Sequence, residues 1–283
     1  MSFINYNIKK ISLSLIEGFY FILKNNLFLF RLIRKAGEMQ LSKKGEIPVS
    51  IIIPTYNEKD NLPVLVKEIY SIIKKTDISP EIVVVDDNSS DGTGALAEDL
   101  AKKYSIQVLK RPGKAGLSSA ILDGLKIAKS DIIGIMDADL SHDPSIIPKM
   151  VDAIVRQKNQ LVIGSRYIKG GKIENWPLKR RIISWVAVFM AFPFTRIKDR
   201  TSGYFFFNRE ILEGIELNPV GFKIGLEIMV KGNYKRWKEI PYVFKDRIAG
   251  QSKLNTGEIR NYLKQLSSFL FYRKPPKMIK TLK

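Results

Sequence analysis

Two aspartates stand one residue apart at the end of an apolar run. The run is "IIGIMDADLSHDP", residues 132–144, with Asp137 and Asp139 where it turns polar. On extended backbone, residues i and i+2 lie on the same face, so the two carboxylates would point the same way. Two carboxylates this close repel each other unless a cation neutralises them. The pattern predicts a site for a hard divalent cation that bridges to a diphosphate. A solvated acidic turn is the alternative.

The composition restricts the chemistry of this acidic pair. The chain has 283 residues, no cysteine and a single histidine, His142. Disulfides and thiolate metal sites are therefore excluded, and one imidazole is too few for a histidine-rich metal site or Ser-His-Asp catalysis. A metal must be held mainly by oxygen, which suits Mg²⁺ or Mn²⁺ better than Zn²⁺.

Positive charge is concentrated at the two ends of the chain. The formal net charge is +19. Residues 1–45 hold eight basic and two acidic residues, and residues 256–283 hold seven and one. Such an excess suggests an anionic partner: nucleic acid, an anionic membrane or a phosphorylated substrate. A lysine-rich compositional bias of the source is the other explanation.

The acidic pair needs a scaffold, and the apolar pattern from residue 49 onward predicts one. Short, β-branched, wholly apolar runs are typical of parallel strands covered on both faces, and segments with helical periodicity separate them. Strands are expected at 49–54, 81–87, 106–111, 131–139 and 160–167, and helices at 61–76, 91–104, 116–129 and 145–156. This alternation predicts an α/β fold with an open, mostly parallel sheet, which binds ligands at the carboxyl ends of its strands.

Amphipathic segments surround this predicted sheet. A helix with a basic entrance is expected near 178–194, broken at Pro193, with strands after it at 201–209 and 238–247. We expect three regions: a basic amphipathic segment at 1–45, a central domain at 46–255, and an amphipathic helix with a basic tail at 256–283. The first region lacks the run of about 20 apolar residues that a spanning helix needs. It is expected to lie on a membrane surface, and packing on the central domain is the alternative.

A second acidic strand end stands in "VVVDDNSSDGT". Asp86 and Asp87 end this apolar run. A carboxylate there can accept hydrogen bonds from a base edge or a ribose. A turn that only caps the next helix is the alternative, and Asp91 suits that role. The adjoining "DGTGALA" matches a dinucleotide-binding pattern, but its first glycine does not directly follow the strand, so NAD binding is not expected.

Eight ordered motifs make the chain recognisable. They are "IIIPTYNEKDNLP", "VVVDDNSSDGT", "GLSSAILDG", "MDADLSHDP", "VIGSRYIKGGKIENWPLKRRIIS", "TSGYFFFNR", "GFKIGLEIMVKG" and "DRIAGQSKL". Together they closely resemble the dolichyl-phosphate (polyprenyl-phosphate) mannose synthases of glycosyltransferase family 2, which have the GT-A fold. The resemblance covers roughly residues 49–265 and does not extend to residues 1–45.

The resemblance implies a donor site with a divalent metal, Mg²⁺ or Mn²⁺. Carried over to this sequence, the donor-binding positions are Pro54, Tyr56, Glu58, Val85, Asp87, Asp137, Ala138, Asp139, Ser141, Arg166, Arg247 and Lys253. The implied metal-binding residues are Asp137, Asp139 and Ser141. Many relatives have a glutamine where this chain has Ser141.

The resemblance also implies an acceptor site. Arg166 would lie between the donor and acceptor phosphates, and Arg180 and Ser184 would bind the acceptor phosphate. The implied catalytic residues are Asp139, Arg166 and Asp199. The chain departs from the family at Arg200, where arginine is not usual. A basic cluster that leads into an apolar helix suits a phosphate with a long prenyl chain.

The implied activity is metal-dependent, inverting transfer of mannose from GDP-mannose to dolichyl or polyprenyl phosphate, giving a β-linked product. Such an enzyme would be peripheral on the cytoplasmic face of a membrane, and some relatives have small membrane-spanning partner subunits. A polyprenyl-phosphate glucosyltransferase that uses UDP-glucose stays open as the alternative. A basic nucleic-acid-binding protein is a different class of alternative, but no binding motif accompanies the charge, so nucleic acid is not an expected partner.

Overall fold

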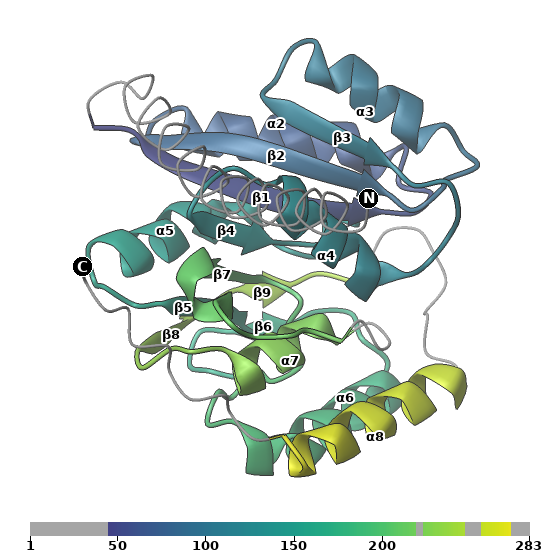
Figure 1. Cartoon of the computed structure of the whole chain (residues 1–283), viewed down its shortest axis with the longest axis vertical. Coiled ribbons are helices and arrows are strands. Elements are labelled where there is room, and N and C mark those ends of the chain that lie inside the picture. Colours follow the sequence, from purple (N-terminus) through teal and green to yellow (C-terminus); the bar gives the residue numbers. More distant parts are fainter. Residues whose placement is uncertain (1–44, 219–222, 247–255, 273–283) are drawn as a thin grey trace, which may run out of the picture. The chain divides into compact units, whose positions relative to one another are not determined.

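A computed structural model gives the fold, and it describes residues 45–218, 223–246 and 256–272. In this part of the chain, seven strands form one sheet in the order β3-β2-β1-β4-β7-β5-β8 (Figure 1). Of these, β7 runs antiparallel to both its neighbours, β4 and β5, and the other pairs are parallel. The predicted α/β fold with a mostly parallel sheet is confirmed. The strands are β1 (Ile47–Thr55), β2 (Ile78–Asp86), β3 (Ile106–Lys110), β4 (Ile132–Ile135), β5 (Leu161–Ser165), β7 (Phe205–Asn208) and β8 (Trp237–Pro241).

Helices cover both faces of this sheet. Along β1, Ile51 and Ile53 pack toward α2 and α5, whereas Ile52 packs toward α4 and α7. Each position of the strand is therefore buried, which explains why the strand runs are apolar at every residue. The helices are α2 (Asn61–Ile73), α3 (Thr93–Ala101), α4 (Leu117–Ile127), α5 (Ile147–Val155) and α7 (Ile224–Lys231).

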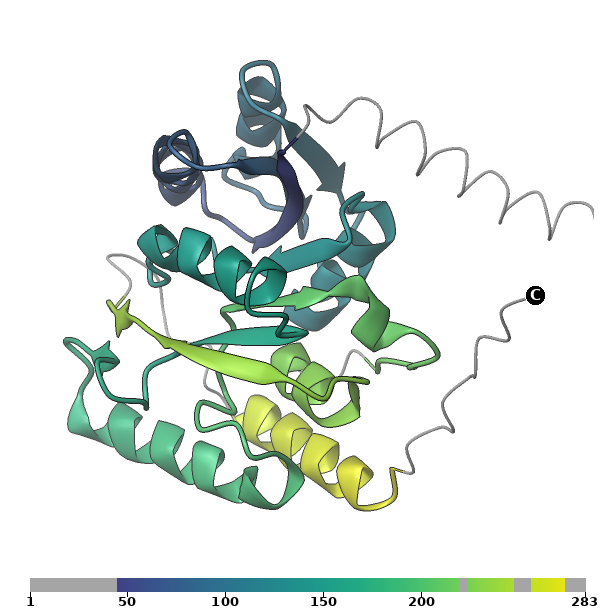
Figure 2. The same cartoon turned by 90° about the vertical axis from the view of Figure 1, so that its left-hand side faces the viewer.

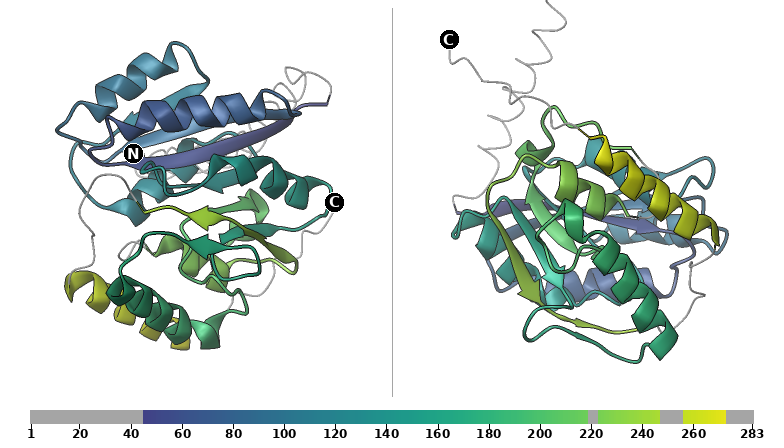
Figure 3. Two further views of the ribbon diagram at one scale, coloured as in Figure 1. Left: turned by 180° about the vertical axis from the view of Figure 1, so that it is seen from behind. Right: turned by 90° about the horizontal axis from the view of Figure 1, so that it is seen from below.

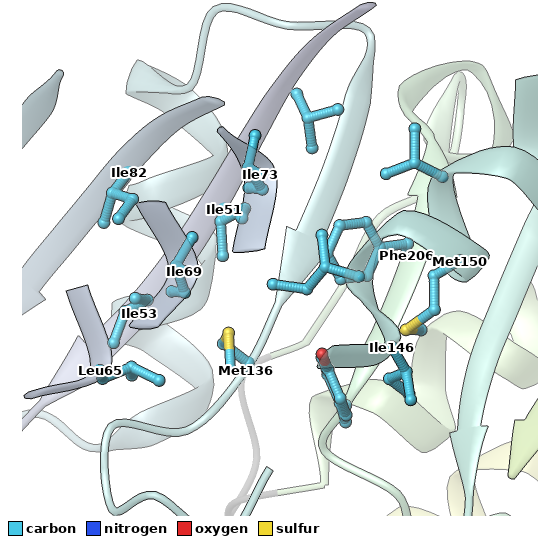
Figure 4. Close-up of a cluster of buried hydrophobic side chains, with 14 of the residues drawn as sticks. Ile51, Ile53, Leu65, Ile69, Ile73, Ile82, Met136, Ile146, Met150 and Phe206 are labelled. Carbon is cyan, nitrogen blue, oxygen red and sulfur yellow. The ribbon is translucent and has the colours of Figure 1, made fainter. Parts of the chain in front are cut away.

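One hydrophobic cluster fills the space between the sheet and helices α2 and α5. Figure 4 shows Leu65 and Ile69 of α2 beside Ile53 of β1. Burial of such side chains contributes about 1.5–3 kcal/mol each. At the centre of the sheet, a β-carbon at Gly134 of β4 would collide with the ring of Phe206, so this glycine allows β7 to pair with β4. Packing of the core thus fixes the position of the end of β4, which the acidic motif follows.

The strand ends directly before that motif, and the chain turns within it. β4 ends at Ile135, so the predicted strand at 131–139 was too long at its carboxyl end. After the two aspartates, Leu140 has a φ of 61°, in the left-handed region, so the chain is not extended there. The carboxylate of Asp139 also accepts a hydrogen bond from the Ser141 amide, 3.2 Å away, which closes a turn. The two aspartates therefore lie in the loop after β4 and are not part of the strand.

The region after β5 contains two elements that the sequence did not predict, the short strand β6 (Lys172–Ile173) and the helix α7. A small sheet pairs β6 with β9 (Val243–Phe244), and these two-residue strands are too short to show a period. Helix α7 is the second, and its eight residues are largely buried all round, which hides helical periodicity. Of the predicted strand at 201–209, only Phe205–Asn208 (β7) forms a strand. The predicted strand at 238–247 is divided into β8 and β9.

Two further helices, α6 (Leu178–Met190) and α8 (Thr256–Leu270), lie side by side beside α7 (Figures 1, 2 and 3). Leu266 and Phe269 of α8 pack against Ala191 and against Leu226 of α7. Helix α6 stops before Pro193, which lies in a short 3₁₀ turn, as predicted. No helix in the described ranges is long and apolar enough to cross a membrane. The predicted amphipathic segment at 1–45 lies outside the described residues, apart from Gly45.

Candidate active site

The acidic pair lies at the carboxyl end of β4, next to β1 in the middle of the sheet. In open α/β sheets this edge is where ligands bind. Asp137 has 36% of its side chain exposed, while Asp139 is buried. The Oδ1 atom of Asp139 accepts hydrogen bonds from the Ser141 hydroxyl at 2.6 Å and from its amide. The predicted metal-binding residues are thus in one turn, where Ser141 orients the carboxylate of Asp139.

His142 supports Asp137 from the protein interior. The Asp137 amide donates to Nδ1 of His142 at 3.0 Å, and Nε2 lies 3.7 Å from Oδ2 of Asp137. The ring stacks on Tyr204 at 4.9 Å between centroids. Burial lowers the pKa of His142, although Asp137 acts in the opposite direction. A neutral imidazole that accepts at Nδ1 is a structural support, and no pattern in the sequence signals this contact.

The donor set of this turn fits a hard divalent cation. Within the described residues, no three His, Cys, Asp or Glu side chains gather into a metal-binding cluster. Mg²⁺ sites in nucleotide enzymes commonly use one or two carboxylates and complete the shell with substrate phosphates and water. A β-carbon at Gly203 would lie 3.5 Å from Oδ2 of Asp137, in ordinary van der Waals contact, so a side chain there would border this carboxylate. The site therefore suits a cation that arrives with a diphosphate.

The first two strands bring the predicted donor-binding residues to the same edge. Tyr56 follows β1, and the ammonium of Lys114 lies 3.5 Å from the centre of its ring. Glu58 accepts a hydrogen bond from Asn61. The side chains of Val85 and Ala138 are buried in the core, so a donor contact at these positions would use the main chain. Pro54 is also buried, within β1.

The two aspartates after β2 hold loops. Asp87 accepts from Arg111 at 2.8 Å and from the amides of Ala115 and Gly116, which ties the β3–α4 loop to the end of β2. Asp86 accepts from Thr55 and Ser89. Both carboxylates therefore brace loops, while the predicted capping role belongs to Asp91, which accepts from the Thr93 amide at 2.9 Å at the start of α3. A donor contact by Asp87 stays a prediction.

Arg166 and Asp199 form a buried ion pair, although they are 33 residues apart. The carboxylate accepts from Nε and Nη2 of Arg166 at 2.8 and 2.7 Å and from its amide at 2.9 Å. Nη2 also donates to the Thr201 hydroxyl at 3.0 Å. Burial alone would lower the pKa of Arg166, but the adjacent Asp199 raises it above the ordinary value, so the guanidinium stays charged. Asp199 is fully buried, so its visible role is to position Arg166.

The predicted acceptor residues gather around Arg166. The hydroxyls of Tyr167 and Ser184 are 2.9 Å apart, which joins α6 to the residue after Arg166. The Trp176 ring lies 4.2 Å from the Arg180 guanidinium carbon and 5.7 Å from that of Arg166. Trp176 and Tyr167 thus link Arg166, Arg180 and Ser184, and their binding of an acceptor phosphate stays a prediction.

Three neighbours of this cluster were missed from the sequence. Tyr167 and Trp176 link its members, and Asp246 forms an ion pair of 2.5 Å with Arg180. Trp176 stands inside "NWPLKRR", so an aromatic residue close to the arginines was the available signal. Two predicted donor-binding residues, Arg247 and Lys253, lie outside the described residues, although Asp246 adjoins the first of them.

Arg200, where the chain departs from the family pattern, has a visible role. It donates to the carbonyl of Thr195 at 3.1 Å and lies over the ring of Phe192. Burial lowers its pKa, against the opposing effect of Glu239. Arg200 thus supports the segment after α6, while its neighbour Asp199 keeps the bonds to Arg166.

Comparisons with known proteins show the family of the chain. The chain is 46% identical over 222 residues to a dolichol-phosphate mannosyltransferase of Pyrococcus furiosus, covering 77% of this chain and 62% of that relative. It is 36% identical to the Saccharomyces cerevisiae dolichol-phosphate mannosyltransferase, and 37% to the Mycolicibacterium smegmatis polyprenol monophosphomannose synthase. In both cases 80% of this chain and 88% of the relative are covered. The chain therefore spans less than two thirds of the Pyrococcus relative and most of the other two.

Solved structures share the fold. The Pyrobaculum calidifontis mannosyltransferase PcManGT, in complex with GDP-Man and Mn²⁺, matches with a TM-score of 0.56 and 21% identity over 88% of this chain and 74% of that one. A Mycobacterium tuberculosis glucosyl-3-phosphoglycerate synthase, with Mn²⁺ and UDP, matches at 0.57 and 19% over 85% of each. The model of Glycosyl transferase family 2 matches residues 50–215. The chain belongs to glycosyltransferase family 2.

Proposed function

We propose that this chain transfers mannose from GDP-mannose to dolichyl or polyprenyl phosphate, with inversion at the anomeric carbon and with Mg²⁺ or Mn²⁺. One observation carries the proposal. The acidic turn after β4 lies at the same sheet edge as a cluster of two arginines and a serine that leads into the apolar helix α6. A carboxylate pair suits a metal diphosphate, and the arginine cluster suits a second phosphate. The names of the relatives and the ligands of PcManGT support the same substrates.

The chemistry requires charge compensation more than a base. A phosphate monoester is substantially ionised at pH 7, so the acceptor is already a nucleophile. An acceptor oxygen forms a bond to the anomeric carbon while the bond from that carbon to the diphosphate breaks, and the electron pair leaves with GDP. Arg166 and Arg180 would hold the nucleophile in line, and Asp137 and Asp139 would hold the metal, which neutralises the departing diphosphate when bound. A single displacement turns an α-linked donor into a β-linked product.

A donor screen tests this function directly. Purified protein is supplied with Mn²⁺ or Mg²⁺, a prenyl phosphate, and either GDP-mannose or UDP-glucose. We expect transfer from GDP-mannose to a lipid product with a β linkage, read by mass spectrometry and NMR. Transfer from UDP-glucose but not from GDP-mannose would overturn the proposed sugar in favour of the glucosyl alternative.

We also propose that helices α6 and α8 rest on the membrane surface, with the acceptor phosphate reaching the arginine cluster from there. On α6, Ile182, Trp185 and Phe189 are 53%, 62% and 64% exposed. On α8, Ile259 and Leu263 are exposed as well. Large exposed apolar patches mark interaction surfaces, and an amphipathic helix with basic residues is typical of the membrane interface. The cytoplasmic face and small membrane-spanning partner subunits stay predictions of the family resemblance.

Replacing Trp185 and Phe189 by glutamate tests the membrane contact. The two rings stack on each other at 5.7 Å between centroids and are exposed, so the change costs little folding energy. Each ring buried in lipid contributes about 1.5–3 kcal/mol. We therefore expect binding to anionic vesicles, read by flotation, to fall at least about tenfold.

The matched control for that pair is Trp237→Glu. Trp237 lies on β8 and is 38% exposed, so its replacement introduces a glutamate at a large apolar residue off the two helices, one where the double variant has two. Its flotation should equal that of the parent. Equal loss in the control, or unchanged flotation in the double variant, contradicts the proposed surface.

A further inference from the structure

Lys223, immediately before α7, binds the loop that carries Asp199. Its ammonium donates to the carbonyl of Thr201 at 3.3 Å. The hydroxyl of the same Thr201 accepts from Nη2 of Arg166. One threonine therefore receives hydrogen bonds from two cations, through its two oxygens. None of the roles assigned above includes this lysine.

The main chain of Lys223 is hydrogen-bonded to α8. Its carbonyl accepts a hydrogen bond from Nε2 of Gln265 at 3.2 Å, and Gln265 is only 4% exposed. Leu266, the next residue, packs against α7 through Leu226. Lys223 is thus the link between α8, which has an exposed apolar face, and the loop that holds Arg166.

Charged groups surround the ammonium of Lys223. Burial lowers its pKa to about 8, and Arg166 acts in the same direction, while Asp199, Asp137 and Glu258 raise it. A lysine held near several charges of the reaction centre is costly to bury, and the bond that its ammonium donates to Thr201 is charge-assisted. A lysine with no role beyond the protein surface would not need to lie among these charged groups.

We propose that Lys223 is a positioning residue of the transfer reaction, which holds residues 199–203, and with them Arg166, in the place that α8 sets. The expected change in the rate of mannose transfer rests on the proposed function. Small displacements of a substrate-positioning group can cost about 10²-fold in rate, so the bond from Lys223 to Thr201 matters although it does not touch the reacting atoms.

The test compares Lys223→Met and Lys223→Arg with the parent. In the methionine variant, we expect kcat to fall at least about tenfold with KM for GDP-mannose changed less than about threefold, because the donor site is intact. Amide hydrogen exchange should become faster in peptides that contain Arg166 and residues 199–203, since the Arg166 amide donates to Asp199. The arginine variant should keep most of the rate.

The pH profile separates this role from a purely structural one. In the parent, kcat should fall on the alkaline side as Lys223 loses its proton, because burial lowers the pKa of this ammonium below that of an exposed lysine. The arginine variant stays charged, so this fall should disappear. Unchanged exchange in Lys223→Met, or an alkaline fall that persists in Lys223→Arg, overturns the proposal.

Lys231→Met is the matched control, since it removes a lysine from the other end of α7. Lys231 pairs with the buried Glu227 at 2.6 Å and makes no bond to the 199–203 loop in the described contacts. An equal loss of kcat in this control would mean that general weakening of α7 explains the effect, and would also overturn the proposal. A parent that transfers no mannose would refute the proposed function, while the exchange measurement still decides whether Lys223 holds the loop.

Discussion

We expect the Asp139→Asn variant to transfer mannose at least about 10³ times more slowly than the parent. Asparagine keeps the shape and can still accept the hydrogen bonds from Ser141, so the turn should remain folded. It removes the negative charge that a divalent cation requires. Metal stabilisation of a leaving group contributes several kcal/mol, and about 4 kcal/mol corresponds to about 10³ in rate. The measurement is the initial rate across a Mn²⁺ titration, together with Mn²⁺ affinity by calorimetry in the presence of GDP.

Asp143→Asn is the control for this experiment. Asp143 lies four residues further along, and its carboxylate accepts from the Ser145 amide at 2.8 Å at the start of a 3₁₀ turn. Asparagine caps a helical turn about as well as aspartate, so this variant should keep both its stability and its response to the metal close to those of the parent. The parent treated with EDTA should also lose its rate and regain it with Mn²⁺ or Mg²⁺. A rate of Asp139→Asn within tenfold of the parent, at unchanged Mn²⁺ affinity, would remove this turn from the reaction.

The parallel half of the sheet could be predicted because its strands are buried on both faces. Ile51, Ile52 and Ile53 alternate between two different helix layers, and both layers demand apolar side chains. That pattern is local and visible in one sequence. The direction of β7 is not local. "FFFN" has the composition of any buried strand, and its antiparallel pairing depends on how the chain returns across the sheet.

The acidic turn likewise combines features that the sequence predicts with features that it does not. The types and spacing of Asp137 and Asp139 are enough to indicate a metal from the sequence alone. The prediction that they share a face of an extended strand was wrong, because β4 ends at Ile135 and Leu140 takes a left-handed conformation. A turn joins Asp139 to Ser141 instead, and the support of Asp137 by His142 depends on aromatic packing that spacing does not reveal.

The arginine cluster could be named only through the family resemblance. Nothing in the spacing of Arg166, Arg180 and Ser184 shows that they meet, since they come from a strand end and a helix. Trp176 and Tyr167 link them, and Trp176 lies beside a small sheet whose two-residue strands are too short to predict. The pairing of Arg166 with Asp199 is likewise a tertiary contact, so both residues could be named from the sequence while their bond could not.

We expect the second large effect from Asp199→Ala, which removes the bond to Arg166. The variant leaves the Arg166 guanidinium buried without its carboxylate and removes three hydrogen bonds. Breaking one side of a buried ion pair costs about 3–5 kcal/mol. For a chain of this size, about 2–4 °C of Tm is lost per kcal/mol, so Tm should fall by roughly 6–20 °C. In the protein that remains folded, kcat should fall at least about 10²-fold, because Arg166 is no longer oriented.

The control for Asp199→Ala must break a comparable ion pair away from Arg166, and Glu227→Ala does so. Glu227 is 2% exposed, pairs with Lys231 and accepts from the Asn218 amide. Its loss should lower Tm by a similar amount, measured by calorimetry, while kcat below the transition stays near the parent value. Asp199→Asn separates the two effects further, because an amide keeps an acceptor for Nη2 but loses the charge. Its Tm should lie between those of the parent and Asp199→Ala. If Glu227→Ala lowered kcat as much as Asp199→Ala, the loss would follow from instability, and Asp199 would have no specific role in orienting Arg166.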